Sequence, residues 1–401
     1  MSTPSTTVPT HDRVLSDDEL AHALAIRDLT DPAHGPHAIQ RVVDAVVTEL
    51  SRHHVPCVQV SRGTPVVPLS DNYDALGYPS DAITREARYT RYADRDHVLR
   101  SHTSALVPPA LRALATAARS APDVLLVCPG ITWRRDSIDW QHTGTPHQLD
   151  LWRISRLPGA HLDEAALQAM IGKVVAAALP GATWRTVPSP HPYTTAGRQI
   201  DVLWEGTWVE IGECGLAAEH VLRGAGLPLE WSGLAMGLGL DRLLMLRKGV
   251  PDIRLLRSAD PRVAVQMLDL EAYQPVSHLP AVRRDLSVAL DSHADVTVES
   301  IGDRVRAALG PDAEVVESVT VLGDAAYDEL PPAARDRLGM EAGQRNLLVR
   351  MVLRPLDRTL TDADANLLRD RVYAALHEGS VHQWAAAGPP VPVSRPGRAQ
   401  R

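Results

Sequence analysis

The chain has 401 residues, of which 44% are hydrophobic, enough for two or three domains with substantial cores. Its formal net charge of -8 excludes nucleic-acid binding through overall positive charge, so any RNA contact requires local basic patches. The three cysteines are far apart, which excludes a disulfide framework and fits a reducing compartment. No apolar run reaches membrane-spanning length and the N-terminus has no hydrophobic signal core, so we expect no membrane partner and a cytoplasmic location.

The first 27 residues are expected to form an N-terminal extension. Residues 1–15 are rich in Ser, Thr and Pro, which predicts disorder. Ser16 is followed by three acidic residues, a pattern typical of a helix N-cap, and predicts a short helix that ends near Arg27.

Apolar residues then recur at helical spacing from Ile39 to Leu50, and a strand is predicted over residues 55–61. A long amphipathic helix that leads into a strand resembles motif 1 of class II aminoacyl-tRNA synthetases, which forms the dimer interface in that family. An ordinary packed helix explains the same pattern equally well.

A helix over residues 109–120 is followed by a predicted long hairpin, with strands 124–135 and 147–154 joined by the loop 137–146. The hairpin carries charged residues where the first strand ends, Arg134, Arg135 and Asp136, and histidines in and just beyond the loop, His142 and His147.

Arginines at a strand end can hold the α-phosphate of a nucleotide in planar, bidentate geometry. The segment resembles motif 2 of the phenylalanyl-tRNA synthetase catalytic subunit. The alternatives are a solvated strand end for Arg134 and Arg135, and a position on the loop surface for His142 and His147. A zinc site is disfavoured, because no third ligand is within sequence range.

The next segments are a predicted helix over 158–180 and a run of strands up to residue 215. His191, Pro192 and Tyr193 stand where the family shows an aromatic, proline, aromatic pattern that lines the amino-acid side-chain pocket. Glu210 lies on a strand that resembles the family strand before motif 3. The resemblance implies that the Glu210 carboxylate binds Mg²⁺ or lies on the ATP side of the site. The alternative is that Glu210 is an ordinary strand residue whose carboxylate accepts its hydrogen bonds within the fold.

The stretch 233–246, GLAMGLGLDRLLML, predicts a glycine-bearing strand followed by a helix that Gly249 ends. Glycines on a strand let a flat ligand approach the backbone, and Arg242 at the helix start can meet a phosphate. This resembles motif 3 of class II synthetases, whose arginine binds ATP. A core strand backed by a helix is the simpler alternative.

Beyond residue 272 a new domain is predicted, with the order strand (286–290), helix (297–309), strand (315–322), strand (347–353), helix (362–376) and a last strand. Thr361 and Asp364 form a candidate capping box for the second helix. The βαββαβ order is ferredoxin-like. It resembles the anticodon-binding domain of the same family.

Three motifs and an appended domain in one order resemble the single-chain, mitochondrial-type phenylalanyl-tRNA synthetases. The resemblance implies an α+β fold: a class II antiparallel sheet flanked by helices (28–270), then a ferredoxin-like anticodon-binding domain (272–387) and a flexible basic tail (388–401). It implies ATP and Mg²⁺ as cofactors, tRNA (of the phenylalanine type) and an amino acid as partners, and a monomer or homodimer.

The resemblance also implies roles for individual residues, carried over by motif. Those expected in catalysis are Arg134, Arg242 and Asp136. Those expected to bind ATP are Arg134, His142, Glu210, Arg242, Gly237 and Gly239, with Mg²⁺ at Glu210. Those expected around the substrate are His102, Ser104, Gln148 and Asp150 at its amino and carboxylate ends, and His191, Tyr193 and Ala235 at its side chain.

The sequence departs from the family at the side-chain pocket, where His191 and Tyr193 replace two phenylalanines. Both can stack on an aromatic ring, and both offer hydrogen bonds that favour a polar or modified aromatic amino acid. Two other functions remain open: adenylation for a non-tRNA acceptor in specialised metabolism, and non-catalytic tRNA binding. The C-terminal domain argues against the first, and the retained Arg134, Asp136, Glu210 and Arg242 argue against the second.

The chain contains no phenylalanine, although Trp and Tyr each occur eight times. Ordinary composition would supply on the order of a dozen. A Phe-free composition without functional meaning is one interpretation. The other is a back-up or resistance synthetase that must be translated when phenylalanyl-tRNA is scarce.

Overall fold

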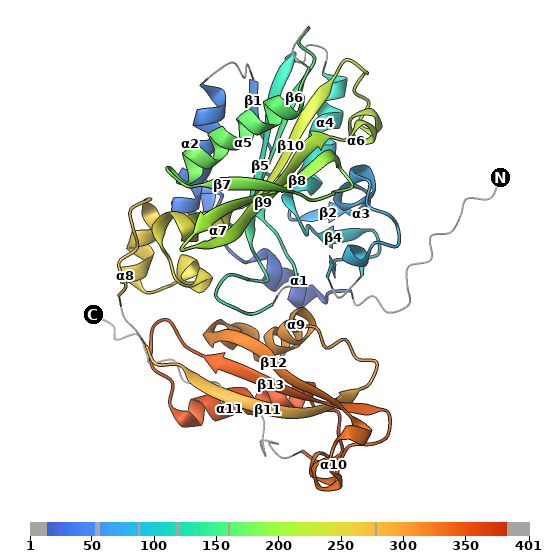
Figure 1. The fold of residues 1–401 in the computed structure, drawn as a ribbon, viewed down its shortest axis with the longest axis vertical. Helices are drawn as coiled ribbons and strands as arrows, with labels where there is room; N and C mark the ends of the chain where they lie inside the picture. Colours follow the sequence, from blue (N-terminus) through green and yellow to red (C-terminus); the bar gives the residue numbers. More distant parts are fainter. Residues whose placement is uncertain are drawn as a thin grey trace, which may run out of the picture. The chain divides into compact units, whose positions relative to one another are not determined.

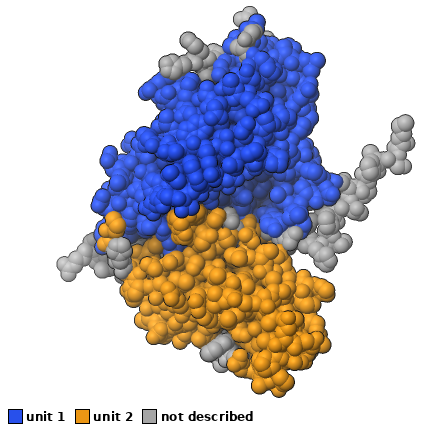
Figure 2. All heavy atoms as spheres, viewed as in Figure 1, with its two compact units in different colours: residues 1–134, 144–274 blue, residues 135–143, 275–401 orange. Residues whose placement is uncertain are grey.

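The structure is a computed structural model that describes residues 14–52, 57–86, 89–117, 121–135, 137–158, 161–276 and 279–382. It divides into two compact units, one of residues 1–134 and 144–274, the other of residues 135–143 and 275–401 (Figure 2). Of the segment expected to be disordered (1–15), residues 1–13 lie outside the described residues, as do the tail from 388 and Asp136. Disorder is wrong for its last residues, because the Leu15 amide donates to the carbonyl oxygen of Tyr92 at 2.8 Å.

The first unit holds ten strands and eight α-helices among its described residues (Figure 1). Its helices are α1 (Asp17–Leu24), α2 (Ala38–Ser51), α3 (Leu69–Asn72), α4 (Val107–Thr116), α5 (Glu164–Ala178), α6 (Glu219–Gly224), α7 (Leu240–Lys248) and α8 (Pro261–Ala264). Its strands are β1 (Cys57–Val60), β2 (Val66–Pro68), β3 (Arg91–Tyr92), β4 (His97–Leu99), β5 (Asp123–Ile131), β6 (His147–Ser155), β7 (Trp184–Pro188), β8 (Thr194–Trp204), β9 (Thr207–Ala217) and β10 (Ser232–Gly239).

A seven-stranded sheet in the order β1-β5-β6-β10-β9-β8-β7 forms the framework of this unit. Only the β1–β5 pair is parallel, and the other five pairs are antiparallel. Helices α4 and α6 pack with Trp152 and Ala235 in one apolar cluster, while α2 packs against α5 and α7. The predicted α+β architecture with a mainly antiparallel sheet flanked by helices is therefore confirmed.

The glycine-bearing strand and the helix after it are confirmed as β10 and α7. Gly249 ends α7 in the left-handed region, at a φ of +67°, where a glycine carries no steric penalty. The predicted N-cap of α1 is a full capping box, in which Glu19 and Ser16 bond each other's backbone amides.

The first hairpin strand is shorter than predicted, because it ends at Ile131 rather than at Arg135. From Trp133 the backbone turns to another partner, since the Trp133 amide donates to the carbonyl oxygen of Arg100 at 3.0 Å. Arg134 still faces the returning chain, because its amide donates to the carbonyl of Gly144 at 2.9 Å.

The second unit contains a three-stranded antiparallel sheet in the order β11-β13-β12. Its elements are β11 (Val282–Asp291), α9 (Val298–Leu309), β12 (Val316–Ala326), α10 (Pro332–Leu338), β13 (Gln344–Leu353) and α11 (Asp362–Leu376). The predicted order is observed up to α11, with α10 added, and Thr361 and Asp364 form the expected capping box. The predicted last strand would follow α11, but the described residues end at residue 382. The ferredoxin-like fold therefore stays a prediction.

The segment 135–143 belongs to the second unit by its contacts, although the chain reaches it from β5. The Ile138 side chain is 7% exposed inside the apolar core of that unit. Its carbonyl accepts a hydrogen bond from the Val319 amide at 3.0 Å, and Arg306 donates to the carbonyl of Ser137 at 2.7 Å. The loop predicted to join two hairpin strands is therefore also a packed piece of the C-terminal unit.

Among the helices of the described residues, none combines the length and apolar character that crossing a membrane requires.

Candidate active site

The floor of the candidate site is the glycine-bearing strand β10. Side chains alternate between the two faces of a strand, so Ala235, Gly237 and Gly239 share one face. A Cβ atom built on Gly237 would lie 3.8 Å from Asp150 Oδ2, and one on Gly239 would meet nothing within 4 Å. The glycines therefore leave space above the backbone at the point where the predicted site residues gather.

Strand β6 supplies one wall of this site. Its register pairs Gln148 with Gly239, Asp150 with Gly237 and Trp152 with Ala235. Cross-strand partners project from the same face of a sheet. The predicted residues Gln148 and Asp150 are therefore brought together beside the predicted glycines.

Strand β9 supplies the opposite wall and contains a residue that sequence analysis missed. Glu213 pairs with Gly237 in the register, on the side of β10 away from Asp150. The pairing of β8 with β9 shifts between Ile200/Gly212 and Asp201/Glu210, which leaves Ile211 as the extra residue of a bulge. Such a bulge places Glu210 and Glu213 on the same face. Strict alternation in the sequence would have placed them on opposite faces, so no simple pattern indicates their proximity.

Asp150 is enclosed by protein donors. The Thr103 hydroxyl donates to its Oδ2 at 2.7 Å, and Trp152 Nε1 lies 3.4 Å from its Oδ1. The residue is 2% exposed, and burial raises the pKa of its carboxyl to about 6 despite these hydrogen bonds. Thr103 also donates through its amide to Gln148 Oε1 at 3.2 Å, so the 3₁₀ turn Thr103–Leu106, which contains the predicted Ser104, is fixed to β6.

His102 precedes that turn and carries two unsatisfied polar atoms. Both of its ring nitrogens are buried without a hydrogen bond of normal geometry among the described residues. Burial, reinforced by the charge of Arg134, lowers the pKa of His102 to about 4, so the ring is neutral. Its ring centroid lies 5.7 Å from that of Tyr78. Buried nitrogens without partners are costly, and a polar ligand would satisfy them.

The two aromatic residues of the predicted side-chain pocket are stacked on each other. The rings of His191 and Tyr193 are 5.7 Å apart at an interplanar angle of 29°. Tyr193 also lies 6.1 Å from Trp152 and 6.3 Å from Tyr78. His191 Nε2 is 2.8 Å from Glu213 Oε1, so the aromatic pair is joined to the acidic wall.

The two predicted phosphate-binding arginines come from the hairpin and from the start of α7. Arg242 donates to the carbonyl of Glu210 at 3.0 Å, and Arg134 is exposed. Burial and the neighbouring Glu213 raise the pKa of the Glu210 carboxyl, while the charges of Arg242 and Arg134 oppose that rise. Positive and negative groups therefore lie close together at this end of the site.

Within the described residues no group of three metal-ligating side chains is arranged to hold a metal ion. A single carboxylate such as Glu210 fits Mg²⁺ only where phosphate oxygens and water complete the coordination, which is the usual arrangement of Mg²⁺ at nucleotide sites. The residues present are therefore compatible with a magnesium ion that arrives with its nucleotide.

His142 stays a predicted ATP-binding residue. It belongs to the second unit, where its Nδ1 lies 2.7 Å from the carboxylate of Asp139. Asp136 falls outside the described residues, so its predicted place in the site is untested.

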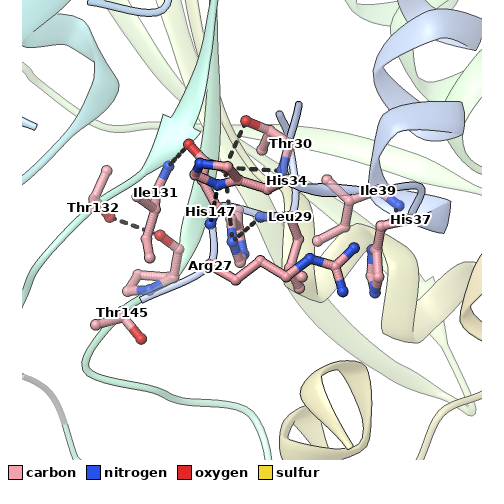
Figure 3. A network of polar contacts seen from close by, with 12 residues as sticks. Arg27, Leu29, Thr30, His34, His37, Ile39, Ile131, Thr132, Thr145 and His147 are labelled. Carbon is pink, nitrogen blue, oxygen red and sulfur yellow. Dashed lines mark hydrogen bonds and ion pairs between the residues drawn. The ribbon is translucent and has the colours of Figure 1, made fainter. Parts of the chain in front are cut away.

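The alternative that His147 lies on the loop surface is wrong, because its side chain is fully buried. Its Nδ1 is 2.9 Å from Asp241 Oδ1, and its Nε2 accepts hydrogen bonds from the Leu29 amide at 3.0 Å and from Arg257 at 3.1 Å. Figure 3 shows how His147 meets the segment around Leu29. In the sequence His147 lies next to a loop. In the fold it is buried because Leu29 and Asp241 of α7 lie against its ring.

Comparison with known proteins identifies the family to which the chain belongs. The model of the class II tRNA synthetase core domain (F) matches residues 30–267. All the predicted site residues, from His102 to Arg242, lie inside that range. The chain belongs to the class II tRNA synthetase core family.

Relatives fall into two groups. A phenylalanine–tRNA ligase alpha subunit from Prochlorococcus marinus (strain MIT 9313) is 34% identical over 209 residues, which cover 52% of this chain and 59% of the relative. The mitochondrial phenylalanine–tRNA ligase of Saccharomyces cerevisiae is 25% identical over 387 residues, which cover 78% of this chain and 80% of the relative.

The chain thus spans about three fifths of the length of the alpha subunits that it matches. A solved pyrrolysyl-tRNA synthetase from Desulfitobacterium hafniense is 18% identical, with a TM-score of 0.43 over 57% of this chain and 76% of that chain. A structural similarity at that level supports no conclusion about this chain.

Proposed function

We propose that the chain is a phenylalanyl-tRNA synthetase-like enzyme that activates an aromatic amino acid with ATP and transfers it to tRNA. The observation that carries this proposal is the grouping of Gln148, Asp150 and Glu213 around the open backbone of Gly237, with Arg134 and Arg242 beside Glu210. The ligases among the relatives support the same assignment.

In the first step, a carboxylate oxygen of the amino acid attacks the α-phosphorus of ATP. The bond to the bridging oxygen breaks, pyrophosphate leaves, and an aminoacyl-adenylate remains. Negative charge grows on the α-phosphate oxygens, and Arg134 and Arg242 are the fixed cations that stabilise it. Mg²⁺ held by Glu210 and by the phosphates would supply further charge neutralisation.

The amino acid occupies the space above β10, between the walls β6 and β9. His102 offers two unpaired ring nitrogens to its polar end, and Ser104 and Gln148 lie in the adjoining turn and strand. Tyr193 and His191 present stacked rings to an aromatic side chain, which favours such a substrate through offset or edge contacts.

In the second step, a terminal ribose hydroxyl of the tRNA attacks the activated carbonyl and releases AMP. The C-terminal unit is the proposed anticodon-binding domain, and tRNA of the phenylalanine type is the proposed partner. We also propose a cytoplasmic location and an assembly that is a monomer or a homodimer.

The test is amino-acid-dependent exchange of pyrophosphate into ATP over a panel of amino acids, followed by charging of total tRNA. Exchange with phenylalanine or a close aromatic analogue, and charging of a phenylalanine tRNA, are expected. Exchange without charging of any tRNA would favour the alternative of adenylation for another acceptor. No exchange with any amino acid would favour the non-catalytic alternative.

The absence of phenylalanine favours a specific role for this enzyme, that of a back-up or resistance synthetase. Large buried positions are filled by other residues, such as Trp133 and Trp152, so the core does not lack bulk. A protein without Phe codons can be made when charged phenylalanine tRNA runs out. Its synthesis should continue in the host while the housekeeping enzyme is inhibited. If its synthesis stops as fast as that of Phe-containing proteins, the back-up role is wrong.

A further inference from the structure

A buried arginine, Arg100, connects two segments that contain predicted site residues. It is 2% exposed and lies two residues before His102, which leads into the turn Thr103–Leu106. Its backbone carbonyl accepts a hydrogen bond from the Trp133 amide at 3.0 Å, and Trp133 directly precedes Arg134. Arg100 is therefore bonded to the segment proposed to hold phosphate and continuous with the segment proposed to hold the amino acid.

The guanidinium group of Arg100 also bonds the end of strand β5. Its Nε donates to the carbonyl oxygen of Ile131 at 2.8 Å, and its Nη1 donates to the carbonyl oxygen of Arg62 at 2.8 Å. The Ile131 amide donates to Asp28 Oδ2 at 3.1 Å. Both backbone polar groups of Ile131 are thus bonded to side chains, which fixes the backbone three residues before Arg134.

The burial of Arg100 is costly for the fold. Its carboxylate partner within the described residues is Asp28, but Nη2 lies 3.8 Å from Asp28 Oδ2, which is beyond hydrogen-bond length. Burial lowers the pKa of the Arg100 guanidinium to about 10, although the charge of Asp28 opposes that shift. A buried charge with so distant a partner stabilises a fold less than a well-packed apolar side chain of similar volume.

Strand β5 accommodates the guanidinium group through Gly130. A Cβ atom built on this glycine would lie 2.2 Å from Arg100 Nη2 and 2.9 Å from Arg100 Cζ, so any side chain there would displace the group. Glycine in the interior of a strand weakens the strand. The buried charge and the strand glycine are two costs at one place, and the packing of the core requires neither of them.

Adenylate formation depends on the distance between the two segments that Arg100 connects. The carboxylate of an amino acid that lies beside His102 must reach the α-phosphorus of a nucleotide that lies beside Arg134. A misplacement of about 1 Å between reacting groups can cost about 100-fold in rate. A residue that is fixed to both segments keeps this distance constant.

We propose that Arg100 is a positioning residue for adenylate formation, which holds Arg134 at a fixed distance from His102 and the turn that follows it. This inference rests on the proposed function and adds to it a residue that acts through others. Arg100 acts on Arg134 through the backbone of Ile131 and Trp133, and Asp28 supports it by accepting the Ile131 amide.

The experiment compares four full-length variants with the wild type. Arg100→Met removes the charge and its donors, Arg100→Lys keeps the charge, and Gly130→Ala displaces the guanidinium group without removing it. Val174→Ala is the control, because it opens a cavity at a buried position of α5 and should lower stability without changing the site. Pyrophosphate exchange gives kcat and the KM for each substrate, and thermal unfolding gives the stability of each variant.

Arg100→Met and Gly130→Ala should each lower kcat about 100-fold, because the reacting groups are no longer held in register. The KM for ATP and for the amino acid should change less than about threefold, because each substrate still binds its own segment. Arg100→Lys should recover part of the rate, since its ammonium group keeps the charge but lacks the planar fork that reaches two carbonyl oxygens. Val174→Ala should keep the wild-type kcat even where its loss of stability equals that of Arg100→Met.

A kcat of folded Arg100→Met that equals that of Val174→Ala would overturn the proposal. So would a rise in either KM with an unchanged kcat, which would indicate a role in binding. If Arg100→Met does not fold, the same comparison is made with Gly130→Ala.

If the wild type catalyses no exchange with any amino acid, the proposed function fails, and hydrogen exchange tests the connection between the two segments. Arg100→Met should then speed amide exchange in residues 102–106 and 131–134 together, relative to Val174→Ala. Unchanged exchange in either segment would show that Arg100 does not connect them.

Discussion

Asp241 on α7 and His147 at the start of β6 form a fully buried pair, with His147 Nδ1 2.9 Å from Asp241 Oδ1. The backbone amide of His147 donates to the other carboxylate oxygen. Burial alone would raise the pKa of Asp241, but His147 and Arg257 hold it below its usual value. The pair joins the start of β6, in the hairpin that contains Arg134, to α7, which contains Arg242. It therefore helps to fix the spacing of these two proposed phosphate-binding arginines.

Removing one partner of this pair should destabilise the fold strongly. His147→Ala leaves a buried carboxylate without its main compensation, a change that costs about 3–5 kcal/mol in comparable buried pairs. Urea unfolding measures the free energy. His97→Ala is the matched control, because its contact with Asp94 is exposed and such pairs contribute little. A loss for His147→Ala no larger than that of the control would contradict the structural role.

The two arginines should matter for chemistry and not for folding. We expect Arg134→Ala and Arg242→Ala each to lower the rate of adenylate formation by about 10²–10³, the effect of removing one preorganised electrostatic group. Pyrophosphate exchange measures the rate, and thermal unfolding verifies the fold. Arg52→Ala, at an exposed side chain on the C-cap of α2, serves as the control. Wild-type exchange in either active-site variant would show that the phosphate assignment is wrong.

The raised pKa of Asp150 predicts a pH-dependent stability difference. The folded carboxyl titrates at about 6 and the unfolded one near its ordinary value of 3.8. The folded state therefore binds the extra proton between these values, and the contribution of Asp150 to stability falls as pH rises from about 4 to about 6. Two units of pKa correspond to about 3 kcal/mol.

Asp150→Asn removes this titration, so its stability relative to the wild type should improve between pH 4 and pH 7.5. The comparison of two proteins at each pH cancels other groups, such as the buried His37, whose pKa is lowered to about 4 by burial. Urea unfolding at both pH values gives the difference. A difference that is constant with pH would show that Asp150 has no raised pKa.

Ile138 should stabilise the C-terminal unit, although it lies in the loop between two strands of the other unit. Its side chain is buried in the apolar core of that unit. Ile138→Ala should lower the stability of this unit by about 2 kcal/mol or more, because it leaves a cavity. Hydrogen exchange of the amides of β12 and α9 reports the loss. Ile83→Ala, with 59% of the residue exposed, is the control and should leave the same amides unchanged.

The sequence was informative where a pattern is local. Helical spacing predicted α2, the glycine-bearing strand predicted β10, and the residue types at Thr361 and Asp364 predicted a capping box that the structure contains. Such features depend on a few neighbouring residues, so periodicity and capping preferences suffice to find them.

Long-range features were beyond sequence reasoning. The bulge at Ile211 decides that Glu213 and Glu210 share a face, and it depends on how β8 pairs with β9. The burial of His147 depends on segments more than 90 residues away in sequence. Ile138 was assigned to a loop because its packing partners lie in another unit of the chain.

The proposed activity is activation of an aromatic amino acid for transfer to tRNA. Its most direct test is a single charging reaction with purified enzyme, ATP, phenylalanine and total tRNA, with AMP release and aminoacylated tRNA measured together. We expect phenylalanine, or a hydroxylated analogue offered in its place, to be attached to a phenylalanine tRNA, with one AMP released for each charged tRNA. Adenylate formation without any charged tRNA, or no AMP release at all with folded protein, would contradict it.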